Sequence, residues 1–102
     1  MNPCFVAHIS NPGPRPPYYL VAEHLWGVGC NIDSDGNSRT PEDTEWTELT
    51  ISLRASEAAT IEVDPIGTAP LVLAVRSRDK ELCQRVAQFL VSRSGGTLNQ
   101  HA

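Results

Sequence analysis

Oxygen-bearing side chains recur between residues 31 and 42 of this chain. Asn31, Asp33, Asp35 and Glu42 are spaced so that a backbone bent at a glycine can turn their oxygens toward one point. Hard cations such as Ca²⁺ prefer several oxygen ligands of this kind. The pattern therefore makes these four residues a candidate metal site.

The same segment resembles the calcium-binding loop of the EF-hand family, with Gly36 at its sixth position and Glu42 at its twelfth. The resemblance implies Ca²⁺ as a cofactor and a helix on each side of the loop. It departs from the family at Asn31, Ser38 and Pro41. Because the flanking segments are more typical of strands, we favour an acidic hairpin loop over a calcium site.

A second candidate site is aromatic and acidic. If Thr47 points toward the core, Trp46 lies on the polar face between Glu45 and Glu48. An exposed tryptophan beside acids can anchor a protein partner, since aromatic residues dominate binding hot spots. The alternative, which we favour, is that Trp46 folds over the core as a lid.

Histidines and cysteines supply the remaining reactive groups. Cys4, His8, His24 and Cys30 are ligand-type side chains, but their spacing matches no zinc motif. His8 or His24 could serve as an acid–base group in a cleft, which keeps a small enzyme among the hypotheses. The sequence identifies no catalytic residue.

The charge is unevenly distributed. The net charge is -4, and residues 31–64 carry most of the acids while the rest of the chain has a basic excess. An acidic middle disfavours nucleic-acid binding and suits a basic protein partner. With no apolar run long enough to span a bilayer, no secretion signal and an odd number of cysteines, we expect no membrane contact and a cytoplasmic location.

Periodicity predicts the elements that position these residues. Strands are expected over 5–9, 28–32, 47–53, 61–64 and 71–75, and a helix capped by Ser77 and ended by Gly95 and Gly96. Tyr18–Trp26 fits either a helix or a strand, and we favour a strand. Residues 11–17 are predicted to be a proline-rich loop, 33–44 an acidic loop, 65–70 a connection and 97–102 a frayed tail.

These elements predict one α+β domain over residues 1–102. It would contain a mostly antiparallel, meander-like sheet of five or six strands with one C-terminal helix on a face. Since Leu71–Val75 is apolar on both sides, the second face also needs cover. Tyr18–Trp26, the proline loop or a second copy of the chain could supply it, the last making a homodimer.

The sequence alone leaves the function unknown. Our leading hypothesis is a small, soluble, non-enzymatic interaction protein, inhibitor-like or immunity-like toward a basic protein partner. The alternatives are a metal-ion or small-molecule binder that uses Asn31–Glu42, and a small enzyme with a histidine-based site.

Overall fold

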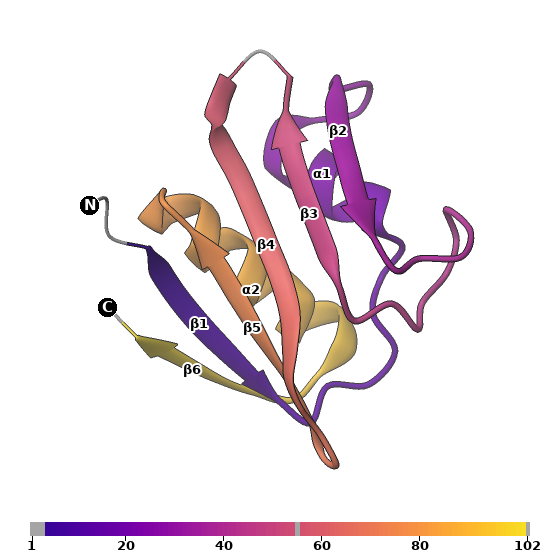
Figure 1. Cartoon of the computed structure of the whole chain (residues 1–102), viewed down its shortest axis with the longest axis vertical. Helices are drawn as coiled ribbons and strands as arrows, with labels where there is room; N and C mark the ends of the chain where they lie inside the picture. The colour runs from indigo at the N-terminus through magenta and orange to yellow at the C-terminus, as the bar shows by residue number, and fades with distance from the viewer. Residues whose placement is uncertain (1–3, 55, 102) are drawn as a thin grey trace.

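The computed structural model of the protein describes residues 4–54 and 56–101. In this part of the chain a six-stranded antiparallel sheet carries two helices (Figure 1). In chain order the elements are β1 (Phe5–Ser10), α1 (Tyr18–Trp26), β2 (Ile32–Gly36), β3 (Leu49–Leu53), β4 (Ser56–Thr68), β5 (Leu71–Ser77), α2 (Lys80–Ser94) and β6 (Thr97–His101). The predicted α+β class and antiparallel sheet are confirmed, whereas the single helix is wrong.

The strands lie in the order β2-β3-β4-β5-β1-β6. Strands β2 to β5 form the predicted meander, and β1 then separates β5 from β6, so the first and the last strand lie side by side (Figure 1). The expected frayed tail is therefore corrected: residues 97–101 pair with β1 as an edge strand. Ala102 lies outside the described residues.

Helix α1 replaces the strand that we favoured for Tyr18–Trp26. Val21, Ala22 and Leu25 are its buried residues, and they pack at helical spacing against α2 and β3. The helix ends at Gly27, whose N–H donates to the carbonyl of Glu23 at 2.8 Å. The apolar residues of this segment fit the period of a helix and that of a strand, so the packing against α2 and β3 decides between the two structures. The strand predicted over 28–32 is consequently wrong, and β2 begins at Ile32.

Helix α2 follows its predicted apolar stripe. Leu82, Cys83, Val86, Phe89 and Leu90 are all buried. Its cap is Asp79, which accepts from the N–H groups of Glu81 and Leu82 at 2.9 and 3.3 Å. Ser77, the predicted cap, instead donates to the carbonyl of Thr60 and accepts from the N–H of Asp79, so it ties α2 to β4.

Strand β4 is longer than predicted because it continues through the proline of the expected 65–70 connection. Its register against β5 shifts between Pro65 and Gly67, and the irregularity accommodates a residue without an N–H. The turn to β5 is reduced to Ala69 and Pro70, which are joined by a cis peptide bond. In the described part of the chain, neither helix is long and apolar enough to cross a membrane.

The core lies between the sheet and the two helices, which cover the same sheet face (Figure 1). Ile9, Ile51, Ile61 and Leu73 project from four strands into it and are completely buried. As predicted, Leu49 and Ile51 face inward on β3. The opposite sheet face is not covered by any described segment.

Trp46 closes the core next to the start of β3. Its side chain is 1% exposed, and its indole N–H donates to the carbonyl of Pro16 at 2.8 Å. In return, the Nε of Arg15 donates to the carbonyl of Trp46 at 2.8 Å. Arg15 is itself 6% exposed and also donates to the carbonyl of Gly13. This pair of reciprocal hydrogen bonds, the Arg15–Trp46 clamp, joins the proline loop to the segment before β3.

Replacing Trp46 with phenylalanine tests the clamp. Trp46→Phe leaves the buried carbonyl of Pro16 without its donor, so we expect the free energy of unfolding to fall by about 1–3 kcal/mol. Urea denaturation followed by circular dichroism measures this. Trp26→Phe is the matched control, because the Trp26 indole is half-buried and has no hydrogen-bond partner among the described residues. Equal losses in the two variants would contradict the role of the clamp.

Candidate functional site

One face of the sheet is not covered by any segment that the structure describes. By the strand registers it carries Val6 and His8 of β1, Thr50 and Ser52 of β3, Glu62 and Asp64 of β4, and Val72, Ala74 and Arg76 of β5. We call it the open face; it is turned toward the viewer in Figure 1. Its composition is mostly polar, unlike the core-facing side of the same strands.

The prediction that Leu71–Val75 is covered on both faces is corrected. Only the helical side is covered, yet Ala74 on the open face is 0% exposed. In the register, Ala74 lies between His8 of β1 and Asp64 of β4, whose longer side chains shield this small residue. The apolar run at Leu71–Val75 therefore looks like a strand that is buried on both sides, although the burial of Ala74 on the open face comes only from its longer polar neighbours.

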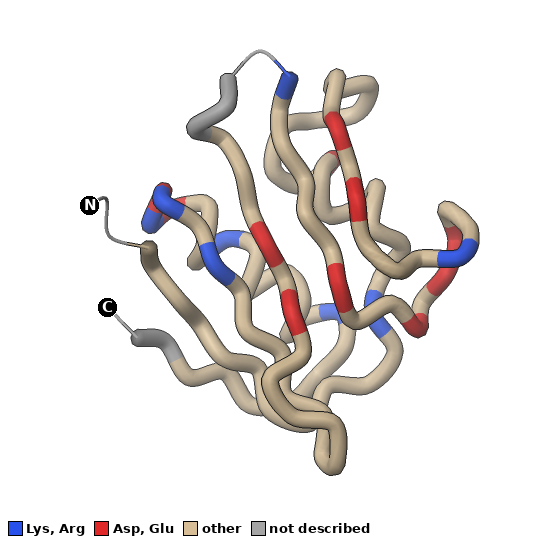
Figure 2. Tube along the Cα trace, in the orientation of Figure 1, with Lys and Arg blue, Asp and Glu red and all other residues tan. Residues whose placement is uncertain are grey.

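Acidic residues concentrate on the half of the open face formed by β2, β3 and β4 (Figure 2). They are Asp33 and Asp35 of β2, Glu48 just before β3, and Glu62 and Asp64 of β4. Arg54 pairs with Asp33 at 2.8 Å, and Arg76 with Asp64 at 3.1 Å. Within residues 4–54 and 56–101, no lysine or arginine forms an ion pair with Asp35, Glu48 or Glu62. The acidic half of the open face therefore keeps a net negative charge.

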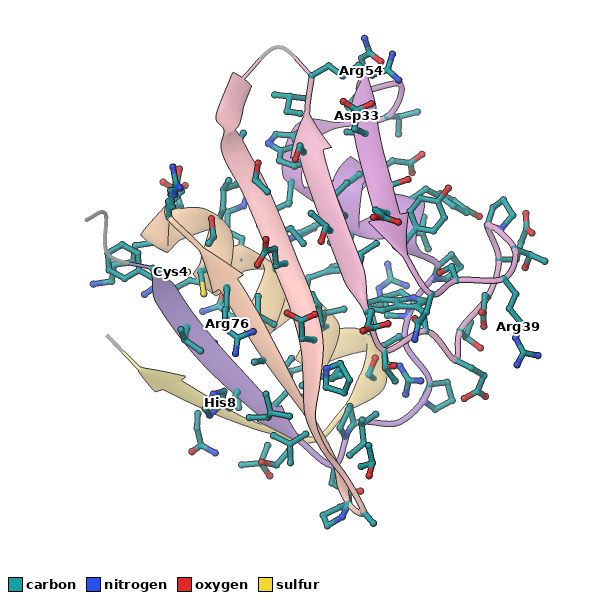
Figure 3. All side chains as sticks on the ribbon, in the orientation of Figure 1. Cys4, His8, Asp33, Arg39, Arg54 and Arg76 are labelled. Atoms are coloured by element: carbon teal, nitrogen blue, oxygen red, sulfur yellow. The ribbon has the colours of Figure 1, made fainter. Side chains whose placement is uncertain are left out.

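The four residues of the calcium-loop resemblance do not converge. Asp33 and Asp35 are on β2, which pairs with β3, and Asp33 is engaged by Arg54 (Figure 3). Asn31 precedes the strand, and Glu42 lies in the loop beyond it. Among the described residues, no three His, Cys, Asp or Glu side chains lie close enough to hold a metal ion. The expected acidic loop over 33–44 is thus partly strand, and the loop proper begins at Asn37.

Asn37 organises this loop, which runs from Asn37 to Glu48. Its side-chain oxygen accepts from the N–H groups of Thr47 and Glu48 at 2.9 and 3.0 Å, and its amide nitrogen donates to the Thr47 hydroxyl. Its backbone N–H donates to the carbonyl of Glu48 at 3.1 Å. These contacts close the base of the loop through a single residue.

The three residues of the aromatic candidate site, Glu45, Trp46 and Glu48, do not form one exposed surface. Trp46 belongs to the core, as in the interpretation that we favoured, so its ring is not an exposed anchor. Glu45 remains exposed, and one of its oxygens lies 3.7 Å from the guanidinium of Arg15. Glu48 is exposed at the margin of the open face. Of this candidate site, only the two carboxylates are accessible to a partner.

The histidines and cysteines are dispersed. His8 lies on the open face (Figure 3), whereas His24 is exposed on α1 and stacks on Phe89 with ring centroids 4.4 Å apart. All three cysteines are free thiols. Burial raises the pKa of the Cys83 thiol, which keeps it protonated and unreactive at neutral pH. The described part of the chain does not bring these groups together in one site.

A polar pocket lies where α1 meets β2 and β3, on the side of the sheet that the helices cover. Its volume is about 200 Å³, and it is lined by Tyr18, Ser34, Asp35, Gly36, Ser38 and Leu49. We call it the edge pocket. Tyr18, Ser34 and Ser38 were not predicted to lie together, because Tyr18–Trp26 was expected to be a strand and not α1. The signal that could have found Tyr18 is the helical spacing of Val21, Ala22 and Leu25, since it predicts a helix that begins at Tyr18.

Comparisons with known proteins add no family assignment. No protein-family model, no curated protein and no solved structure matches the chain. The function must therefore be argued from the surface described above.

The end of β2 requires glycine at position 36, both for its positive φ and for lack of space for a Cβ atom. Two substitutions separate these two causes. Gly36 has a φ of 152°, and a Cβ there would collide with the carbonyl oxygen of Glu48. Gly29 also has a positive φ, of 84°, but a Cβ there meets nothing within 4 Å. We expect Gly29→Ala to cost about 1 kcal/mol from backbone strain alone, and Gly36→Ala to cost about 2–4 kcal/mol. Urea denaturation of the two variants measures the difference, and equal costs would contradict the close packing of β2 on the start of β3.

Asp43 gives the loop a dependence on pH. Its carboxylate accepts from the N–H groups of Arg39 and Glu45 at 2.9 and 2.8 Å, and these bonds lower the pKa of Asp43 below its usual 3.8. Because the folded pKa is depressed, the stabilisation is complete above pH 3.8 and is lost as the pH falls through the lowered value.

An acid titration followed by NMR tests this dependence. The amide signals of Arg39 and Glu45 should shift together with a midpoint below 3.8. Asp43→Asn should abolish that shift, whereas Glu42→Gln, a change at the exposed neighbouring acid, should preserve it. A midpoint at or above the ordinary value would show that these two bonds do not form in solution.

Proposed function

We propose that this protein is a non-enzymatic binding protein that covers a basic surface of another protein with its open face. The observation that supports this function is the concentration of acidic side chains on a sheet face that no described segment covers. Asp35, Glu48 and Glu62 lack ion-pair partners within the described residues, so their charge is available to an incoming cation.

The sheet gives this surface a fixed shape. Strands β3 and β4 are paired on both sides, and their inward side chains, such as Ile51 and Ile61, are completely buried. The acids are therefore held on a rigid backbone, and binding requires little ordering of the chain. Opposite charge on the partner would speed association and fix its orientation. A small inhibitor-like or immunity-like protein that blocks a basic functional surface is the concrete form of this proposal.

The charge also bears on the homodimer that we predicted. Two open faces brought together would place acids against acids, which is unfavourable. The homodimer therefore stays a prediction only for other surfaces, such as the free edges of β2 and β6, and light scattering at high concentration tests it.

The free thiols suit a reducing compartment, so we place the interaction in the cytoplasm.

A pair of charge-matched double variants tests the proposed function. Glu48→Gln with Glu62→Gln removes two charges from the open face, whereas Glu23→Gln with Glu81→Gln removes two charges from the helices. A partner captured from the source cells and then purified should be basic. We expect the first double variant to weaken its affinity about tenfold or more, with a shallower dependence on salt, and the second to change it less than about threefold.

Two results would contradict the proposal. One is equal affinity of both double variants for the captured partner. The other is an affinity that does not change with salt concentration, since exposed charges are screened by added ions. Circular dichroism of both double variants is the control for folding.

A further inference from the structure

Two of the three cysteines are close neighbours, although the histidines and Cys30 lie elsewhere. The Cys4 thiol donates to the carbonyl oxygen of Phe5 at 3.8 Å, and the Cys83 thiol of α2 donates to the same oxygen at 3.5 Å. Because both distances end at one atom, the two sulfur atoms lie no farther apart than the sum of these two distances. Cys4, which Figure 3 labels at the start of β1, therefore forms a thiol pair with Cys83 at the beginning of α2.

The two thiols of this pair differ in their access to solvent. Cys4 is exposed, whereas Cys83 is buried and also donates to the carbonyl of Val75 at 3.5 Å. Burial raises the pKa of Cys83, and the negative charge that Cys4 carries as a thiolate raises it further. Cys83 is thus unreactive toward reagents in solution, and such a reagent reacts with Cys4 first.

We propose that Cys4 and Cys83 are an oxidation site, at which hydrogen peroxide converts the thiol pair into an intramolecular disulfide. An accessible cysteine beside a second thiol is typical of redox-sensitive sites. Rotation about the Cα–Cβ bonds brings the sulfur atoms together, and Cys4 can follow because the pairing of β1 with β5 begins only at Phe5. This inference is independent of the proposed function.

The oxidation takes two steps. The Cys4 thiolate attacks an oxygen of hydrogen peroxide, so an S–O bond forms, the O–O bond breaks, and the hydroxide that leaves takes up a proton to give water. Cys83 then loses its proton and attacks the sulfur of Cys4, so the S–S bond forms, the S–O bond breaks, and a second hydroxide leaves and becomes water. The two sulfur atoms give up one electron each, and the peroxide gains both. Proximity compensates for the small thiolate fraction of Cys83 in the second step.

The surroundings of Cys4 argue against other fates of its thiol. Cys30 lies just before β2, which is four strand spacings from β1 in the sheet, or roughly 19 Å, so it is too distant to replace Cys83. In the described part of the chain no three ligand side chains lie close enough to hold a metal ion. An oxidised cysteine without a neighbouring thiol proceeds to irreversible forms, and Cys83 provides the thiol that prevents this.

Peptide mapping after peroxide treatment tests the site. In Cys30→Ser the remaining thiols are Cys4 and Cys83, and trypsin places them in peptides 1–39 and 81–85, because Arg15 is followed by proline. We expect equimolar hydrogen peroxide to join these two peptides within a monomer, with loss of two hydrogen atoms, and dithiothreitol to release them. A Cys4–Cys4 link between two chains, an oxygenated Cys4 without a link, or two unchanged thiols would overturn the proposal.

Two variants separate the roles of the thiols. Cys83→Ser keeps a donor for the carbonyls of Phe5 and Val75, and its Cys4 should persist as a sulfenic acid that dimedone captures. Cys4→Ser changes an exposed position and should fold normally, and its remaining thiols should react with peroxide at least tenfold more slowly than the native chain. Equal dimedone capture in the native chain and in Cys83→Ser, or an unchanged rate in Cys4→Ser, would contradict these roles.

The disulfide should also stabilise the fold, because it closes the long loop between the start of β1 and α2. We expect the oxidised Cys30→Ser chain to melt at least about 5 °C above its reduced form, as measured by circular dichroism. A lower melting temperature of the oxidised form would show that the bond distorts the packing around Phe5, and it would overturn the claim that the native fold already places the two thiols together.

Discussion

The arrangement of the site depends on the reciprocal hydrogen bonds of the Arg15–Trp46 clamp. Trp46 donates to Pro16, one residue before the N-cap of α1, and Arg15 donates back to the carbonyl of Trp46. The backbone N–H of Arg15 also donates to the carbonyl of Thr44 at 2.8 Å. The clamp thus fixes the start of α1 against the segment that leads into β3, and this brings Tyr18 to the edge of β2. A buried guanidinium is costly unless its donors are used, which makes the arrangement sensitive to the loss of either residue.

Placing both helices on one face determines what the sheet can do. The helical side contains the apolar core, and the other side is left with polar and charged side chains (Figure 3). Because β4 and β5 lie at the centre, their outward residues, including Glu62 and Arg76, form a broad and rigid platform. A surface of this kind can recognise a partner through charge without any catalytic group. This links the position of α1, which a local pattern left ambiguous, to the function that we propose.

Much of the fold could be predicted from periodicity. The alternation of Leu49 and Ile51, the apolar run at Leu73 and the helical spacing of Val86 and Leu90 all report burial, which local sequence records directly. The identity of α1 and the pairing of β6 could not be obtained this way. Both depend on contacts with segments distant in sequence: α1 packs on α2, and Leu98 of β6 lies opposite Ile9 of β1.

The candidate site was predicted less well, for the same reason. The acidic character of residues 31–64 indicated a charged surface, but the calcium-loop resemblance assumed a bend where β2 is extended and paired. Alternation alone placed Trp46 on the polar face, and the favoured alternative, a lid on the core, agrees with its burial; the hydrogen bond to Pro16, thirty positions earlier in the chain, could not be predicted. The edge pocket joins Tyr18 to Ser38 across α1 and β2, and no local pattern encodes that proximity.

Cross-saturation NMR of the complex tests the central claim most directly. Saturation is transferred from a protonated partner to the deuterated chain and marks the residues in contact. We expect transfer to open-face residues of β3 and β4, such as Thr50 and Glu62, and none to the exposed residues of α1 and α2. Transfer confined to the helices, with Thr50 and Glu62 unaffected, would show that the acidic open face is not the binding surface.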